Sequence, residues 1–320
     1  MKELQEEDRA KGELLLLGGI DYDEAAGGKT KKKGRRHSGE SEVIKGQQWG
    51  FLDGSLSEVG AIESLYRDLY EVDRDDLIKL TRKAATEQKL RELAPGYEIL
   101  HLATHGFFAK QEFRTGSDVA EDEFQKRSGM GSIFSNQAIA SANSHNPGIL
   151  SGLVLAGANK ASQATDADDG IMTAQEISYL PLRGTKLVTL SACETGLGKV
   201  ADREGLIGIQ RAFQVSGAKT VIATTWKVDD KMTQKLMELF YRNYFEKKMG
   251  KLAALRAAQL SILNDPDAVK GVNSTRGAVR DRRRIENSKP AAIPKRTNPY
   301  YWAPFILSGD WHTRAPTSTG

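Results

Sequence analysis

Cysteine is almost absent from this chain: Cys193 is the only one among 320 residues. A single cysteine excludes any disulfide within the chain, and sequences that do without disulfides are typical of reducing compartments. We therefore expect a cytoplasmic protein, from a bacterium or an archaeon.

Long apolar runs are also missing. No stretch approaches the roughly 18 apolar residues that a membrane-spanning helix requires. Residues 1–11 are charged and lack the apolar segment of a signal peptide. The hydrophobic fraction of 39% and the mean hydropathy of −0.48 indicate a compact core diluted by solvated loops. A chain of this length can bury a sizeable core, and we expect one domain over residues 1–320 without a membrane partner.

Positive charge is concentrated in two short stretches, although the net charge is only +4. Residues 29–36 carry six basic side chains and no acid, and residues 270–296 carry nine against two acids. Both stretches contain glycine, serine or proline and lack apolar periodicity, which predicts basic loops at 28–48 and 265–298. Nucleic-acid binding is the alternative. We favour solvated loops, because neither stretch interleaves aromatic residues or forms a recognition helix.

Apolar runs alternate with segments of helical periodicity over most of the sequence. Expected strands lie at 14–20, 97–105, 186–193 and 219–225, and expected helices at 57–70, 204–215, 232–245 and 251–263. This alternation predicts an α/β fold with a mainly parallel central sheet and helices on both faces. Residues 109–148 are polar and lack periodicity, which predicts a flexible insertion.

Two helix starts have recognisable caps. Thr173 with Glu176 three residues later has the spacing of a capping box, in which each residue bonds the other's backbone. Ser57 precedes the apolar periodicity of the 57–70 segment and is the expected N-cap there.

One thiol and one imidazole follow two of the expected buried strands. The run Lys186-Leu-Val-Thr-Leu-Ser-Ala-Cys193 is followed at once by Glu-Thr-Gly-Leu-Gly, and Tyr97-Glu-Ile-Leu-His-Leu-Ala-Thr-His105 is followed by Gly106. The carboxyl ends of parallel strands form the ligand-binding edge of an α/β sheet. We therefore expect Cys193 and His105 to lie close together.

These residue types suit nucleophilic catalysis. A cysteine thiolate attacks a carbonyl carbon, and an adjacent imidazole takes the thiol proton. The backbone N–H groups of Gly106 and Cys193 are the expected oxyanion-hole donors. Each residue alone is explained by packing, which is our prediction for His101 inside the same strand, but the joint pattern favours a Cys/His site.

The segments around both residues resemble a known family. Clan CD cysteine peptidases, the caspase-like group, use a His-Gly after one strand and a cysteine after a later one. Caspases separate the two by about 50 residues; 88 separate them here, and the insertion at 109–148 accounts for the excess. More closely, the chain resembles the CHAT domain, a bacterial caspase-like domain often fused to tetratricopeptide repeats. The matching segments are His101-Leu-Ala-Thr-His-Gly106, Asp169-Gly-Ile-Met-Thr-Ala-Gln-Glu-Ile177, Leu187-Val-Thr-Leu-Ser-Ala-Cys-Glu-Thr-Gly196, Glu204-Gly-Leu-Ile-Gly208, Ala212-Phe-Gln-Val-Ser-Gly-Ala218, Trp226-Lys-Val-Asp-Asp230 and Tyr301-Trp-Ala-Pro-Phe-Ile-Leu-Ser-Gly-Asp310.

The resemblance implies a caspase-like three-layer sandwich and a Cys193/His105 dyad. It also implies cysteine endopeptidase chemistry on a protein substrate, with neither metal nor cofactor. No tetratricopeptide period is evident in this sequence. We expect regulation by a partner, such as a tetratricopeptide-repeat module, because an unrestrained peptidase would be toxic to its own cell. The basic loop at 265–298 is a candidate for self-cleavage, if the substrate pocket is acidic.

Four further residues are candidates for the substrate pocket. Acidic residues line the pocket in several relatives, which makes Asp169 and Asp229 candidates for a basic-selective site; helix capping or loop solvation explains either equally well. Trp226 is a candidate wall of the groove, with a buried aromatic as the alternative. Glu194 either shapes the field at the thiolate or bonds within its turn, and we favour the turn.

Three other hypotheses stay open. The aspartates at 166, 168 and 169 suggest a cation site, but their spacing fits no specific loop, and we expect no metal. A non-catalytic scaffold that binds partners is the main alternative to a peptidase. A Cys/His hydrolase or acyltransferase acting on small molecules is the third.

Overall fold

A computed structural model describes residues 12–25, 48–73, 75–108, 151–163, 168–191, 193–194, 201–226, 229–265, 267 and 296–311. The three expected insertions, at 28–48, 109–148 and 265–298, lie almost entirely outside these described residues.

A six-stranded sheet forms the centre of the molecule, in the order β10-β9-β7-β3-β1-β2. Its strands are β1 (Gly12–Ile20), β2 (Leu77–Arg82), β3 (Tyr97–Leu102), β7 (Leu187–Leu190), β9 (Thr220–Thr224) and β10 (Phe305–Gly309). All neighbours are parallel except β10, which runs antiparallel to β9. The predicted mainly parallel sheet is confirmed.

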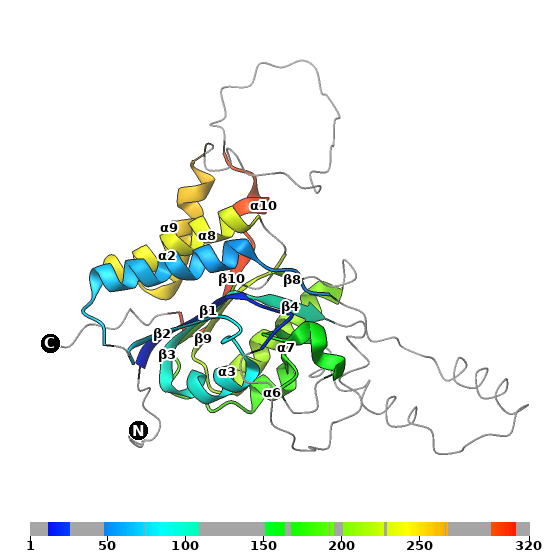
Figure 1. Cartoon of the computed structure of the whole chain (residues 1–320). Coiled ribbons are helices and arrows are strands. Elements are labelled where there is room, and N and C mark those ends of the chain that lie inside the picture. The colour runs from blue at the N-terminus through cyan, green and yellow to red at the C-terminus, as the bar shows by residue number, and fades with distance from the viewer. Residues whose placement is uncertain are drawn as a thin grey trace, which may run out of the picture.

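Helices cover both faces of this sheet, as Figure 1 shows. One layer contains α2 (Asp53–Leu69), α8 (Asp230–Tyr241) and α9 (Lys251–Leu263), and the other contains α3 (Glu87–Leu93), α6 (Ala174–Ser178) and α7 (Ala201–Val215). Shorter elements are η2 (Ala94–Gly96), η4 (Ala158–Gln163), the π-helical η5 (Arg242–Glu246) and α10 (Pro299–Trp302). The result is the expected three-layer sandwich. Among the described helices, none combines the length and apolar character needed to cross a bilayer.

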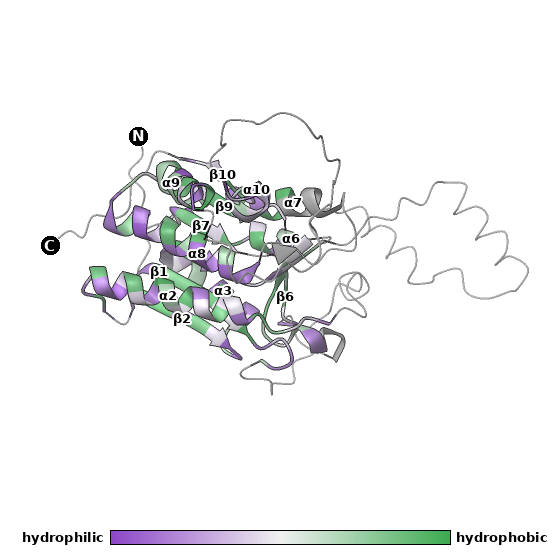
Figure 2. Ribbon diagram, turned by 90° about the horizontal axis from the view of Figure 1, so that it is seen from above, coloured by the Kyte–Doolittle hydropathy of each residue, from purple (hydrophilic) through white to green (hydrophobic). Residues whose placement is uncertain are grey.

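Strand β1 shows why its sequence is a continuous apolar run. Leu14 and Leu16 pack with the α2, α8 and α9 layer, whereas Leu15 and Leu17 pack with the opposite layer. All four are fully buried, and each contributes about 1.5–3 kcal/mol relative to an exposed side chain. Figure 2 shows the same arrangement, with hydrophobic strands between helices whose polar faces point outward.

Helix α2 lies unusually close to the end of β1. A Cβ at Gly18 would come within 2.8 Å of both the Ser55 carbonyl oxygen and Val59 Cγ1, so only glycine permits this approach. The next residue, Gly19, donates its N–H to Ser55 Oγ at 2.9 Å. These contacts fix the first turn of α2 against the sheet.

The predicted start of α2 is wrong. The helix begins at Asp53 rather than after Ser57, and Leu52 is its N-cap residue. Ser57 Oγ instead donates to the Asp53 carbonyl inside the helix. The extra turn is stabilised by its contacts with β1, which apolar periodicity within the helix does not reveal. The capping box at α6 is confirmed: Thr173 Oγ1 accepts from the Glu176 N–H, and Glu176 Oε2 accepts from the Thr173 N–H.

The two runs that were expected to end at His105 and Cys193 are not single strands. Each leaves the central sheet and continues in a second sheet of order β6-β5-β4-β8, made of β6 (Ile171–Thr173), β5 (Ser151–Val154), β4 (His105–Phe108) and β8 (Cys193–Glu194). The Ala103 N–H still bonds the Leu17 carbonyl, but from His105 onward the chain pairs with β5 and β8. His105 and Cys193 therefore begin short strands instead of ending long ones.

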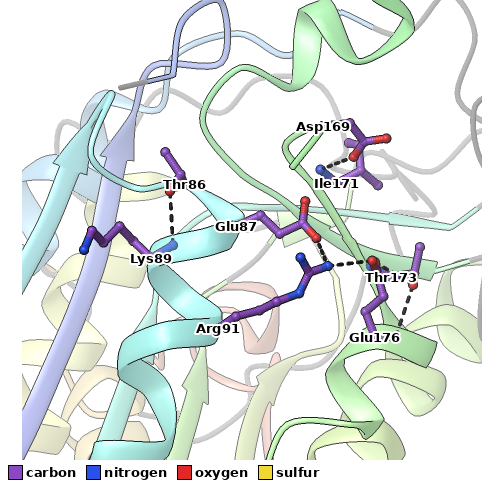
Figure 3. A network of polar contacts seen from close by, with 8 residues as sticks. All are labelled: Thr86, Glu87, Lys89, Arg91, Asp169, Ile171, Thr173 and Glu176. Carbon is purple, nitrogen blue, oxygen red and sulfur yellow. Dashed lines mark hydrogen bonds and ion pairs between the residues drawn. The ribbon is translucent and has the colours of Figure 1, made fainter. Parts of the chain in front are cut away.

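A buried carboxylic acid lies on the α3 side of the molecule, shown in Figure 3. Glu87 is fully buried beside Arg91, which also contacts Glu176 Oε1 at 2.6 Å. Burial, reinforced by the negative charge of Glu176, raises the pKa of Glu87 to about 9. One arginine is thus shared by two carboxyl groups, of which Glu87 stays protonated at neutral pH.

This protonation predicts how stability depends on pH. Between about pH 4.5 and 9 the folded chain holds a proton on Glu87 that the unfolded chain releases, so the free energy of unfolding falls as pH rises. Replacing Glu87 by Gln, which mimics the protonated acid, should flatten this slope by up to about 1.4 kcal/mol per pH unit. Urea unfolding of both proteins at about pH 6, 7 and 8 measures this slope. A difference between the two proteins that does not vary with pH would contradict the prediction.

Candidate active site

The backbones of His105 and Cys193 lie directly opposite each other. Strands β4 and β8 are parallel, with His105 paired to Cys193 and Gly106 paired to Glu194. Adjacent strands are about 4.8 Å apart. The two residues predicted to form the dyad thus come from neighbouring strands, in register.

This register is inherited from the central sheet. In β3 and β7, His101 is paired with Thr189. Four residues later on each strand, His105 is paired with Cys193. Both segments therefore leave one sheet and enter the next with equal lengths of chain, which preserves the alignment.

The imidazole of His105 packs against two aromatic rings. Its exposed fraction is only 7%. The Tyr22 ring centroid lies 5.0 Å from it at an interplanar angle of 46°, and the Trp49 centroid lies 5.3 Å away at 40°. Such contacts favour a single ring orientation.

A backbone carbonyl selects the tautomer of His105. The Nε2 atom lies 2.8 Å from the Gly50 carbonyl oxygen. A carbonyl oxygen only accepts, so Nε2 carries the hydrogen and donates it. The lone pair of the neutral ring is therefore on Nδ1, which is the nitrogen able to take a proton.

Asn159 holds the segment that supplies this carbonyl. Its Oδ1 accepts from the Trp49 N–H at 2.8 Å, and its Nδ2 donates to the Trp49 carbonyl at 3.1 Å. The same Nδ2 donates to Asp23 Oδ1 at 2.8 Å. Because both sides of Trp49 are bound, the next residue, Gly50, is held beside His105.

A chain of hydroxyl groups fixes the backbone of His105. Thr104 Oγ1 donates to the Val154 carbonyl, which uses its only proton. The Tyr22 hydroxyl, 3.1 Å from Thr104 Oγ1, is therefore the donor in that pair, and it accepts from the His105 N–H. Burial raises the pKa of Tyr22 to about 12, so the phenol keeps its proton.

Each of the two predicted acidic pocket residues accepts a hydrogen bond from the backbone N–H two residues later. Asp169 Oδ1 accepts from the Ile171 N–H at 3.0 Å (Figure 3). Asp229 is the N-cap of α8, where its Oδ1 accepts from the Lys231 N–H at 3.0 Å. Helix capping thus describes the contact of Asp229, whereas Asp169 bonds within the turn before β6. The part of both residues in a substrate pocket stays a prediction.

The remaining predicted residues are placed as follows. Trp226 is 37% exposed, and its indole N–H donates to the Tyr300 carbonyl at 3.1 Å. Trp226 is thus not the buried aromatic of the alternative hypothesis. Glu194 is placed by its backbone, paired with Gly106. Gly106 also pairs with Leu153 on its other side.

The described ranges contain no group of three His, Cys, Asp or Glu side chains arranged to hold a metal ion. Of the aspartates considered for a cation site, the one at position 166 lies outside those ranges.

The residues that hold His105 were not predicted from the sequence. Tyr22, Trp49, Gly50 and Asn159 belong to no motif, and they lie 50 or more residues from His105 along the chain. The sequence offers only a weak signal for them: Tyr22 closely follows the first expected strand, and Trp49 directly follows the first basic loop.

The family model of the CHAT domain matches residues 2–310. No curated protein matches the chain.

The hydroxyl chain predicts a stability loss in Tyr22→Phe. Without the Tyr22 oxygen, the buried His105 N–H loses its acceptor, which costs about 1–3 kcal/mol. Tyr97→Phe is the matched control, because the Tyr97 hydroxyl donates to the Asp75 carbonyl at a partly buried site where water can replace it. Urea denaturation should show the larger loss for Tyr22→Phe, and equal losses would contradict this account.

Proposed function

The chain belongs to the CHAT domain family, and on that premise we propose that it is a cysteine endopeptidase. Cys193 is the nucleophile and His105 the general base. The observation that carries the proposal is the pairing of these two residues, in register, on adjacent strands.

The tautomer of His105 gives the base its direction. Nδ1 takes the proton of the Cys193 thiol, and the thiolate attacks the carbonyl carbon of a peptide bond. The imidazolium that forms keeps its Nε2–H bonded to the Gly50 carbonyl. It then gives the Nδ1 proton to the leaving amine. Water, deprotonated by the same nitrogen, hydrolyses the thioester and regenerates the thiol.

The oxyanion of the tetrahedral intermediate needs N–H donors. We assign the backbone N–H of Cys193 and that of Gly106 to this role. Their pairing across β4 and β8 keeps the two backbones adjacent. This chemistry uses only groups of the chain itself and requires no cofactor.

A protein is the proposed substrate. The exposure of Trp226, which follows β9 closely in the chain, supports a role for this residue as one wall of the substrate groove. Asp169, Asp229 and Glu194 complete the proposed pocket. A regulatory partner, such as a tetratricopeptide-repeat module, would control access, because an unrestrained peptidase would damage its own cell.

Covalent labelling tests the nucleophile. A peptidyl chloromethyl ketone should alkylate Cys193, and intact mass should show one adduct per chain. His105→Ala should slow labelling about 100-fold or more, the usual contribution of a general base. Cys193→Ala is the control and should not react. If labelling fails with and without candidate partners, and His105→Ala makes no difference, the non-catalytic scaffold is favoured instead.

Self-cleavage is a separate prediction. The basic loop at 265–298 lies almost wholly outside the described residues, so its sequence alone supports the idea. Purified wild-type protein should separate into two fragments by intact-mass analysis, whereas Cys193→Ala should stay whole. One unclipped mass for labelling-competent wild type would exclude self-processing without affecting the endopeptidase proposal.

A further inference from the structure

A second histidine, four residues before His105 in the chain, belongs to a fully buried polar network. His101 is 0% exposed and Glu58, on α2, is 2% exposed. Glu58 Oε1 lies 3.1 Å from His101 Nε2. On the other side of the ring, His101 Nδ1 lies 3.1 Å from the Tyr241 hydroxyl. His101 is buried as predicted, but it is not a simple packing residue.

The positions of the hydrogens in this network follow from its donors and acceptors. The Tyr241 hydroxyl donates to Thr189 Oγ1 at 3.1 Å, so it accepts from His101, and Nδ1 carries a hydrogen. Within the described residues, neither Glu58 Oε1 nor His101 Nε2 has any other hydrogen-bond partner. Two lone pairs facing each other would repel, so one proton lies between them. Glu58 and His101 thus form a pair that is neutral overall.

The second oxygen of Glu58 reaches the other strand. Ser191 Oγ donates to Glu58 Oε2 at 3.0 Å. One carboxylate therefore contacts both segments that lead to the candidate dyad. His101 lies four residues before His105, and Ser191 lies two residues before Cys193.

The helix that carries this carboxylate is itself anchored. Gly18 allows α2 to approach β1 closely, and Ser55 bonds the Gly19 N–H one turn before Glu58. The carboxylate is thus held from the helix side and bonded on the strand side. Its position is set before either strand reaches the second sheet.

We infer that Glu58 is a positioning residue for the Cys193/His105 pair, because it connects the two strands immediately before they deliver these residues. The inference rests on the proposed function, and it assigns Glu58 no contact with substrate. Buried ion pairs are weak sources of stability, since apolar replacements are often neutral or better. Alignment of the two strands is the role that this geometry supports.

The single cysteine makes the inference measurable. Cys193 is the only thiol that iodoacetamide can alkylate, so the rate of thiol alkylation reports this residue without peptide binding or hydrolysis. A thiolate paired with His105 reacts below the pH at which a free thiol, with pKa near about 8.5, becomes reactive. The pH profile of alkylation therefore reports whether Cys193 and His105 are aligned.

In Glu58→Ala, the profile should shift toward that of a free thiol. The alkylation rate at pH 7 should fall about 10-fold or more, because an ordinary thiol is only a few per cent ionised there. Glu58→Gln should keep the wild-type profile, since its amide oxygen accepts from Ser191 and its amide N–H donates to His101 Nε2. Glu63→Ala is the matched control: Glu63 lies on the same helix and pairs with Lys79 and Arg67, so its loss should leave the profile unchanged.

Thermal unfolding and circular dichroism accompany each variant. If Glu58→Ala does not fold, Ser191→Ala decides, because it removes one hydroxyl and should shift the profile part of the way. A double replacement, Glu58→Leu with His101→Phe, fills the same space with apolar groups and should fold yet still show the shifted profile.

The outcomes separate this inference from the proposed function. If the pH profile of alkylation shifts in His105→Ala but not in folded Glu58→Ala, or not in Ser191→Ala, the positioning role alone is overturned. If the wild-type profile already matches that of a free thiol and His105→Ala leaves it unchanged, both the positioning role and the proposed function are overturned. Equal shifts in Glu58→Ala and Glu58→Gln also overturn the positioning role, because Gln keeps the contacts with both Ser191 and His101.

Discussion

The parallel register between β3 and β7 is the constraint on which the candidate site depends. Backbone hydrogen bonds pair His101 with Thr189 in the central sheet. The same alignment reappears four residues later, where His105 meets Cys193 in the second sheet. A slip of one residue would send each side chain to the opposite face of its sheet. A slip in β3 would also turn His101 away from Glu58 and Tyr241. The contacts that hold this register in the central sheet therefore also align the proposed catalytic pair.

The two faces of the sheet handle buried acids in different ways. On the α2 side, Glu58 lies against His101 and forms a pair that is neutral overall. On the α3 side, Glu87 shares Arg91 with a second carboxylate, and burial raises its pKa to about 9. Both arrangements avoid an isolated buried charge, which would be costly. The first joins a helix to the strands that lead to the site, whereas the second joins helices on the far side.

Much of the fold could be predicted from the sequence because its signals are local. The apolar run of β1 and the capping box of Thr173 and Glu176 were recognised from neighbouring residues alone. The break between β3 and β4 was not recognised, because it depends on where the partner strand ends: the Ala103 N–H makes the last bond to β1. The first turn of α2 was missed for the same reason, since it is stabilised by contacts with Gly18 and Gly19.

The α/β class, the family resemblance and the two residue types of the proposed dyad could all be predicted from local sequence patterns. A lone cysteine and a His-Gly after apolar runs are visible without coordinates. The nitrogen of His105 that carries the lone pair could not be predicted in this way, because the Gly50 carbonyl reaches the ring from a distant part of the chain. The contacts of Glu58 with both strands likewise depend on the folded arrangement. Hydrogen bonds between distant segments depend on three-dimensional packing, which no local pattern in the sequence records.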